Sequence, residues 1–190
     1  HYIDEGDADA QNLFYYEKFL KEREQQGLKN EQFAVGSDKQ LTLKSDAESF
    51  PTFRIQNIAG NGKIWTGEGS ATRAIADQYP NGRLHENSSS CVFRLEYGNF
   101  AYYMGGDISG GYSKKGLKKA PWNDMQTAVS KVIGTVDVAL ADHHGYRDSM
   151  NENLLKALNT NVIVLPIWDL YHPHPAAMTR IVKQGVPEIF

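Results

Sequence analysis

The second half of the chain alternates between strand-like and helix-like segments, and this order strongly limits the folds open to it. Apolar and polar side chains alternate over residues 91–97, and Gly98-Asn99 makes a tight turn into a second apolar segment, residues 100–104. Two further buried strands are expected at residues 136–140 and 161–166. Helical spacing predicts helices over residues 122–132 and 151–158, and a last one from Pro175 to near Gly185. This alternation predicts an α/β, α+β layered domain.

The first half shows weaker patterns. Leu13, Tyr16 and Leu20 fall at helical spacing, and Gly27 is a natural stop for that helix. A hairpin is expected over residues 52–66, with its turn at Asn61-Gly62. Residues 67–90 are rich in Gly, Ser, Asn and charged side chains, which predicts a long surface loop.

Length and composition set outer bounds on function. A chain of 190 residues forms one domain or part of one, and here residues 1–190 are taken as a single, partial domain. The formal net charge of −3 gives no basic field for nucleic acid, so a nucleic-acid substrate stays open without support from charge. Cys91 is the only cysteine, which excludes a cysteine zinc cluster, and its strand pattern predicts a buried, inert thiol. No apolar stretch reaches membrane-span length, and the localisation is left open.

Polar clusters follow three of the expected strands. Asp107 comes after residues 100–104, His143 and His144 follow residues 136–140, and His172 and His174 follow residues 161–166. Strand ends are where layered α/β proteins place functional residues, and a carboxylate with several imidazoles suits zinc or a similar divalent ion.

Each cluster also has a bland interpretation: a turn aspartate, adjacent surface histidines, and a rigid Tyr-His-Pro-His-Pro loop. All three clusters stand directly after a predicted strand, and this shared position favours a functional site over the bland interpretation.

The same segments resemble a known family. Residues 86–100 running into Gly106-Asp107-Ile108, then Ala141-Asp142-His143-His144-Gly145, then His172-Pro173-His174-Pro175, are similar to three motifs of the metallo-β-lactamase superfamily. The similarity is closest to the subgroup of DNA-uptake competence proteins and their soluble relatives, and it covers about residues 50–185. It implies an αββα sandwich, of which this chain would form the C-terminal portion, and one or two zinc ions between the sheets.

The resemblance also implies roles for individual residues. Asp107 would bridge two metals and His144 would bind the second, so that the metals share a hydroxide and lower its pKa. His143 and His172 would contact the anionic oxygen of the substrate. Tyr146 stands where the subgroup has serine, and it would contact the substrate together with His174.

One motif of the family is absent. No His-x-His-x-Asp-His occurs in the 190 residues, so it is expected before His1. This chain alone should then bind metal weakly and be inactive, and a missing N-terminal half or another chain should cover its sheet. The expected activity is metal-dependent hydrolysis of a phosphodiester or related anionic ester. The alternatives are a non-catalytic binding module of the same fold, or a hydrolase of another ester, amide or lactone.

Overall fold

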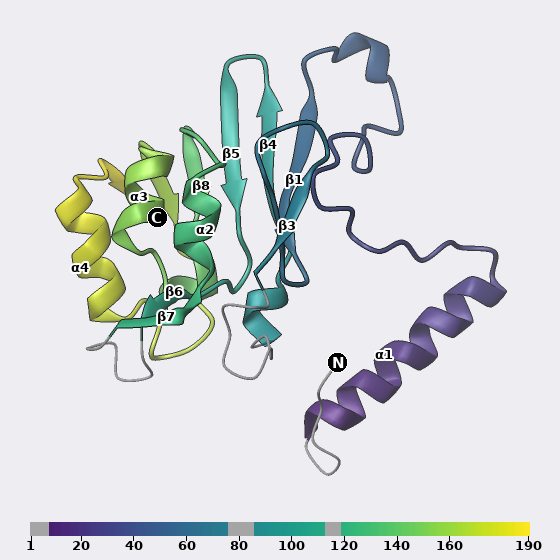
Figure 1. Ribbon diagram of the computed structural model, residues 1–190, viewed down its shortest axis with the longest axis horizontal. Helices are drawn as coiled ribbons and strands as arrows, with labels where there is room; N and C mark the ends of the chain where they lie inside the picture. The colour runs from purple at the N-terminus through teal and green to yellow at the C-terminus, as the bar shows by residue number, and fades with distance from the viewer. Residues whose placement is uncertain (1–7, 76–85, 113–118) are drawn as a thin grey trace. The chain divides into compact units, whose positions relative to one another are not determined.

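The computed structural model describes residues 8–75, 86–112 and 119–190 (Figure 1). Contacts divide the chain into two compact units, residues 1–32 and 33–190. The first unit contains helix α1 (Ala8–Gln25), and Gly27 follows it with φ +80°. The expected helix and its glycine stop are therefore confirmed.

The second unit is built on an eight-stranded mixed sheet, in the order β10-β9-β8-β5-β4-β1-β2-β3. Strands β5, β8, β9 and β10 run parallel to one another, and the remaining pairs are antiparallel. The strands are β1 (Arg54–Gly60), β2 (Lys63–Trp65), β3 (Thr72–Ala74), β4 (Val92–Tyr97), β5 (Phe100–Met104), β8 (Val138–Leu140), β9 (Val162–Val164) and β10 (Glu188–Ile189). A second, two-stranded sheet pairs β6 (Gly110–Tyr112) with β7 (Lys119–Asp124).

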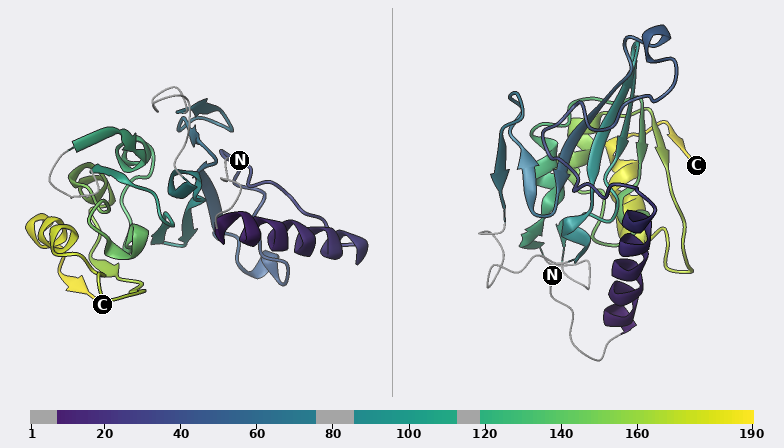
Figure 2. Two further views of the ribbon diagram at one scale, coloured as in Figure 1. Left: turned by 90° about the horizontal axis from the view of Figure 1, so that it is seen from below. Right: turned by 90° about the vertical axis from the view of Figure 1, so that its right-hand side faces the viewer.

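Three helices of this unit, α2 (Met125–Ser130), α3 (Glu152–Leu158) and α4 (Pro175–Gln184), gather on one side of the sheet (Figures 1 and 2). Local chemistry sets their ends. Asp124 and Asn151 accept the backbone N–H of residues 127 and 154 at the starts of α2 and α3. Gly185, in the left-handed region, ends α4 as expected.

The two faces of the sheet differ in burial. On the inner face the helices cover a close-packed core, since period-two alternation turns every second strand residue toward them. The inner strand residues are Val92, Ala101, Tyr103, Ala139 and Ile163, all buried. The outer face of β4, β5, β8 and β9 is also apolar, with eight half-buried side chains that do not belong to the core cluster. These outer-face residues are Phe93, Leu95, Tyr102, Met104, Val138, Leu140, Val162 and Val164.

The strand pair predicted over residues 91–107 is confirmed. β4 and β5 are antiparallel in a register that pairs Tyr97 with Phe100, and Asp107 follows β5 in a loop. The expectation for Cys91 was wrong, because β4 begins one residue later and the thiol is exposed. Val92 takes the buried position instead.

Two further segments differ from expectation. The helix predicted over residues 122–132 begins only at Met125, because residues 119–124 form β7. The stretch 67–90, expected as a surface loop, contains β3 and a 3-10 helix, η4 (Glu86–Ser89), with Ile75 and Ser88 buried. Residues 76–85 of that stretch lie outside the described part of the chain.

The second unit thus has the predicted α+β layered architecture, with one helical layer on a large mixed sheet. None of the described helices has the length and apolar character needed to cross a lipid bilayer.

Candidate functional site

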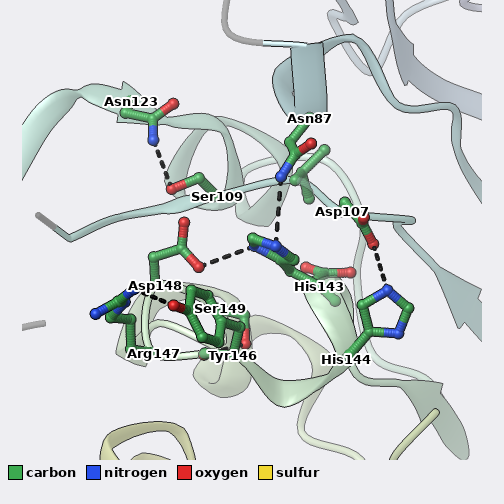
Figure 3. A network of polar contacts seen from close by, with 12 residues as sticks. Asn87, Asp107, Ser109, Asn123, His143, His144, Tyr146, Arg147, Asp148 and Ser149 are labelled. Atoms are coloured by element: carbon green, nitrogen blue, oxygen red, sulfur yellow. Dashed lines mark hydrogen bonds and ion pairs between the residues drawn. The ribbon is translucent and has the colours of Figure 1, made fainter. Parts of the chain in front are cut away.

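The loops after β5, β8 and β9 meet at one end of the sheet, because these strands are parallel neighbours. Backbone hydrogen bonds join the three loops directly. The N–H of His143 donates to the carbonyl of Gly106 at 2.9 Å, and the N–H of His174 donates to that of Gly145 at 2.9 Å. Figure 3 shows Asp107, His143, His144 and Tyr146 at this place, and ring contacts bring His172 and His174 to it.

The histidine pair lies in a strained turn. His143 and His144 belong to a short 3-10 segment, η5 (Asp142–Gly145), and both have positive φ, 45° and 55°. Residues with a Cβ rarely adopt this left-handed region, and two in succession cost free energy. Such strain persists only where the surrounding structure holds it, and it is concentrated at functional sites.

A buried carboxyl group holds this turn from beneath. Asp142 is 1% exposed, and its Oδ2 accepts hydrogen bonds from the hydroxyl of Tyr103 at 3.0 Å and from Nε2 of Gln126 at 2.8 Å. Burial raises the pKa of Asp142 well above its usual range, against the lowering effect of these two bonds. A Cβ on Gly105 would clash with Oδ1 of Asp142 and with the hydroxyl of Tyr103, so only glycine fits there.

His144 and Asp107 form the contact that best fits a metal ion. Nε2 of His144 lies 3.6 Å from Oδ1 of Asp107, while Nδ1 of His144 is 2.7 Å from the carbonyl oxygen of Pro166. A carbonyl only accepts, so Nδ1 carries the proton and Nε2 offers a lone pair when the ring is neutral. This is the arrangement typical of metal-ligating histidines. Two ligands of a tetrahedral zinc lie about 3.3 Å apart, given bonds of about 2.0–2.1 Å, so the pair fits joint ligation.

His143 faces different partners. Its Nδ1 lies 2.9 Å from Oδ1 of Asp148, and its Nε2 lies 3.4 Å from Nδ2 of Asn87 (Figure 3). Burial lowers the pKa of His143, but the hydrogen bond and charge of Asp148 outweigh it, and the net pKa is raised. Burial raises the pKa of Asp148, but the hydrogen bond and charge of His143 outweigh it, and the net pKa is lowered. The two groups therefore favour each other's charged forms.

Aromatic rings line the rest of the site. The ring of His172 stacks on that of His144, with centroids 5.1 Å apart and planes 19° apart. The ring of Tyr146 meets His172 edge-on at 5.3 Å and lies 5.1 Å from His143. Nδ1 of His172 faces Oδ1 of Asp169 at 3.6 Å, and the His172 side chain is 8% exposed. His172 and Tyr146 are thus part of the cluster that the sequence predicted.

His174 has a structural contact of its own. Its Nδ1 accepts the backbone N–H of Ala176 at 3.2 Å and caps helix α4. Its ring lies 6.1 Å from that of Tyr146, at the edge of the cluster. Burial and the nearby charges of Arg147 and Arg180 lower the pKa of His174. The cap leaves Nε2 as the atom of His174 available for other contacts.

The loop after β9 is exposed and apolar. Its large side chains are Ile167, Trp168, Leu170 and Tyr171, exposed by 61%, 79%, 100% and 72%. The ring of Trp168 lies 6.4 Å from that of His144, so the loop borders the site.

Sequence reasoning did not find several residues of this network. Asp148 lies outside the three motifs, and Asn87 and Asp142 stand inside them without a predicted role of their own. Arg180 on α4 is nearly buried, and its guanidinium donates to the carbonyls of Arg147, Ser149 and Met150. Only the structure shows that these backbone acceptors converge on one side chain.

The described residues offer a partial ligand set. They contain no group of three or more His, Cys, Asp or Glu side chains placed to hold one metal ion, and the Asp107–His144 pair offers two donor atoms 3.6 Å apart. No protein-family model matches the chain, and no curated protein matches it.

Proposed function

We propose that this chain supplies part of the metal centre of a metallo-β-lactamase-type hydrolase that cleaves phosphodiesters or related anionic esters. The observation that carries the proposal is the Asp107–His144 pair, in which a carboxylate oxygen and a free imidazole nitrogen face each other at 3.6 Å. The resemblance of the three loop motifs to that superfamily points to the same chemistry.

Zinc fits the donor set, since it accepts imidazole nitrogen and carboxylate oxygen. Asp107 and His144 would hold it, and the carbonyl of Pro166 would fix the ring of His144. When bound, the metal supplies Lewis-acid activation of water and of the substrate. In this proposal His143 and His172 orient the anionic oxygen of the substrate, and Tyr146 and Nε2 of His174 complete the wall beside it.

The alternative is a non-catalytic binding module of the same fold. The limited ligand set among the described residues favours it, since two ligands fall short of the three or four that zinc normally has. The hydrolase requires further zinc ligands besides Asp107 and His144, whereas the binding module does not.

Three measurements test the proposal. The gene sequence before His1 should encode a His-x-His-x-Asp-His motif, and the protein it encodes should hydrolyse bis(p-nitrophenyl) phosphate in a zinc-dependent manner. Asp107→Ala and His144→Ala should each lower zinc affinity at least about 10-fold, measured by calorimetry. Asp169→Asn is the matched control, because that carboxylate is 46% exposed and faces His172 rather than the pair. An encoded protein that lacks the motif, or zinc affinity unchanged by both alanine variants, would overturn the hydrolase assignment.

A further inference from the structure

A chain of polar groups extends from His143 away from the Asp107–His144 pair (Figure 3). Asp148 contacts Nδ1 of His143 at 2.9 Å, and both side chains are largely buried, 17% and 19% exposed. Behind Asp148, the hydroxyl of Ser109 accepts from Nδ2 of Asn123 at 2.9 Å, and Oδ1 of Asn123 accepts from the hydroxyl of Ser88 at 3.1 Å. A side-chain hydrogen bond from Ser109 contributes to lowering the pKa of Asp148.

The two hydrogen-bond partners of His143 determine which ring nitrogen carries the proton when the imidazole is neutral. An ionised carboxylate only accepts, so Nδ1 of His143 is the donor in the contact with Asp148. An amide nitrogen only donates, so Nε2 of His143 is the acceptor in the contact with Asn87. The opposite tautomer would place an N–H against the Asn87 amide and leave Asp148 without its donor.

Asp148 is itself held in place from both sides. Its carbonyl accepts the N–H of Gly110 at 2.6 Å, and Arg180 bonds the carbonyls of the residues on either side of it, Arg147 and Ser149. The carboxylate therefore has a fixed position relative to the loop after β5 and to helix α4. A fixed acceptor of this kind sets the orientation of a histidine ring.

We propose that Asp148 is a positioning residue, which fixes the ring orientation of His143 and holds it in the Nδ1–H tautomer, with Nε2 accepting from Asn87. This inference deepens the proposed function and rests on it only for the part played by the substrate. Asp107 and His144 hold the metal, while Asp148 and His143 form a separate pair whose geometry needs no metal.

Long-range ¹H–¹⁵N correlation spectra test the inference without any assay, because they distinguish the two imidazole tautomers. In the wild-type chain at a pH where His143 is neutral, we expect Nδ1 to carry the proton. Asp148→Ala should raise the population of the Nε2–H form. Asp148→Asn should keep the Nδ1–H form, because its amide oxygen still accepts. Asp169→Asn, which removes the carboxylate beside His172, is the matched control and should leave the His143 signals unchanged.

A wild-type spectrum in which His143 carries its proton on Nε2 would overturn the inference, as would an Asp148→Ala variant that keeps the Nδ1–H form. The wild-type measurement needs no variant to fold. In the active protein, Asp148→Ala should lower kcat about 10–100-fold, with little change in KM or zinc content. Asp148→Asn should keep most of the wild-type kcat. Lack of any hydrolase activity would contradict the proposed function but leave the spectroscopic result standing.

Discussion

Asp142 shows how one buried residue can define a site without facing it. Its carboxyl group ties η5 to Tyr103 at the end of β5 and to Gln126 on α2, beneath two histidines with positive φ. Its Oδ1 has no hydrogen-bond partner among the described atoms. An ionised group there would lack solvation, which is why burial raises the pKa of Asp142.

Replacing Asp142 with asparagine should therefore change how stability depends on pH. The folded-state pKa of Asp142 is raised, so its stabilising contribution is complete below about pH 4, the unfolded-state pKa, and is lost as the pH rises toward the folded pKa. Asp142→Asn cannot ionise, so its free energy of unfolding relative to the wild type should increase from pH 4 to pH 8. Urea unfolding at several pH values measures this, and a constant difference between the two proteins would contradict it.

The sequence was enough to predict which residues of the site come together, but not what each contacts. Asp107, His143, His144 and His172 were expected in one place because each follows a strand of the alternating half, and the loops do meet. The partners Asp148 and Pro166 could not be predicted, because hydrogen-bond geometry depends on turn conformation. The same limit applies to His174, whose Nδ1 caps a helix.

Elements with strong local signals were predicted well. Helices α3 and α4 begin and end within a residue or so of expectation because an N-cap asparagine, an N1 proline and a terminal glycine mark their ends. Elements that depend on distant partners were missed. β3 and β7 exist because β2 and β6 pair with them, and neither has apolar alternation of its own.

Helix α4 should owe much of its attachment to one side chain. Arg180 reaches from α4 to the carbonyls of the 147–150 loop, so Arg180→Met would keep the apolar stem and leave these acceptors unpaired. We expect a loss of about 3 kcal/mol in the free energy of unfolding, since buried unpaired acceptors cost about 1–3 kcal/mol each. Lys183→Met, at an exposed position of the same helix, is the control and should change stability by less than about 0.5 kcal/mol. Equal effects in denaturant unfolding would show that the Arg180 network is not what attaches α4.

In the second unit, both faces of the sheet are apolar, but the described helices of this unit cover only the inner face. The inner face has its helical layer, whereas the outer face carries eight half-buried apolar side chains from β4, β5, β8 and β9. Apolar residues on both faces are typical of strands covered on both sides, and these eight side chains each keep part of their surface exposed to solvent. The expectation of a second covering layer, from sequence before His1 or from another chain, stays a prediction that this surface supports.

Two adjacent residues of β9 test that prediction, because they point to opposite faces. Ile163 is fully buried against the helices, so Ile163→Ala should cost about 2–5 kcal/mol in the 190-residue chain. Val162 lies on the outer face, so Val162→Ala should cost less than about 1 kcal/mol in the same chain. If a second layer covers the outer face, the cost of Val162→Ala should rise toward that of a core substitution once the layer is present, because its methyl groups then leave water completely. Chemical denaturation of both variants, in the chain alone and in the protein encoded by the whole gene, gives the comparison. A Val162 substitution that stays as mild in that larger protein as in the isolated chain would show that the outer face remains open to solvent.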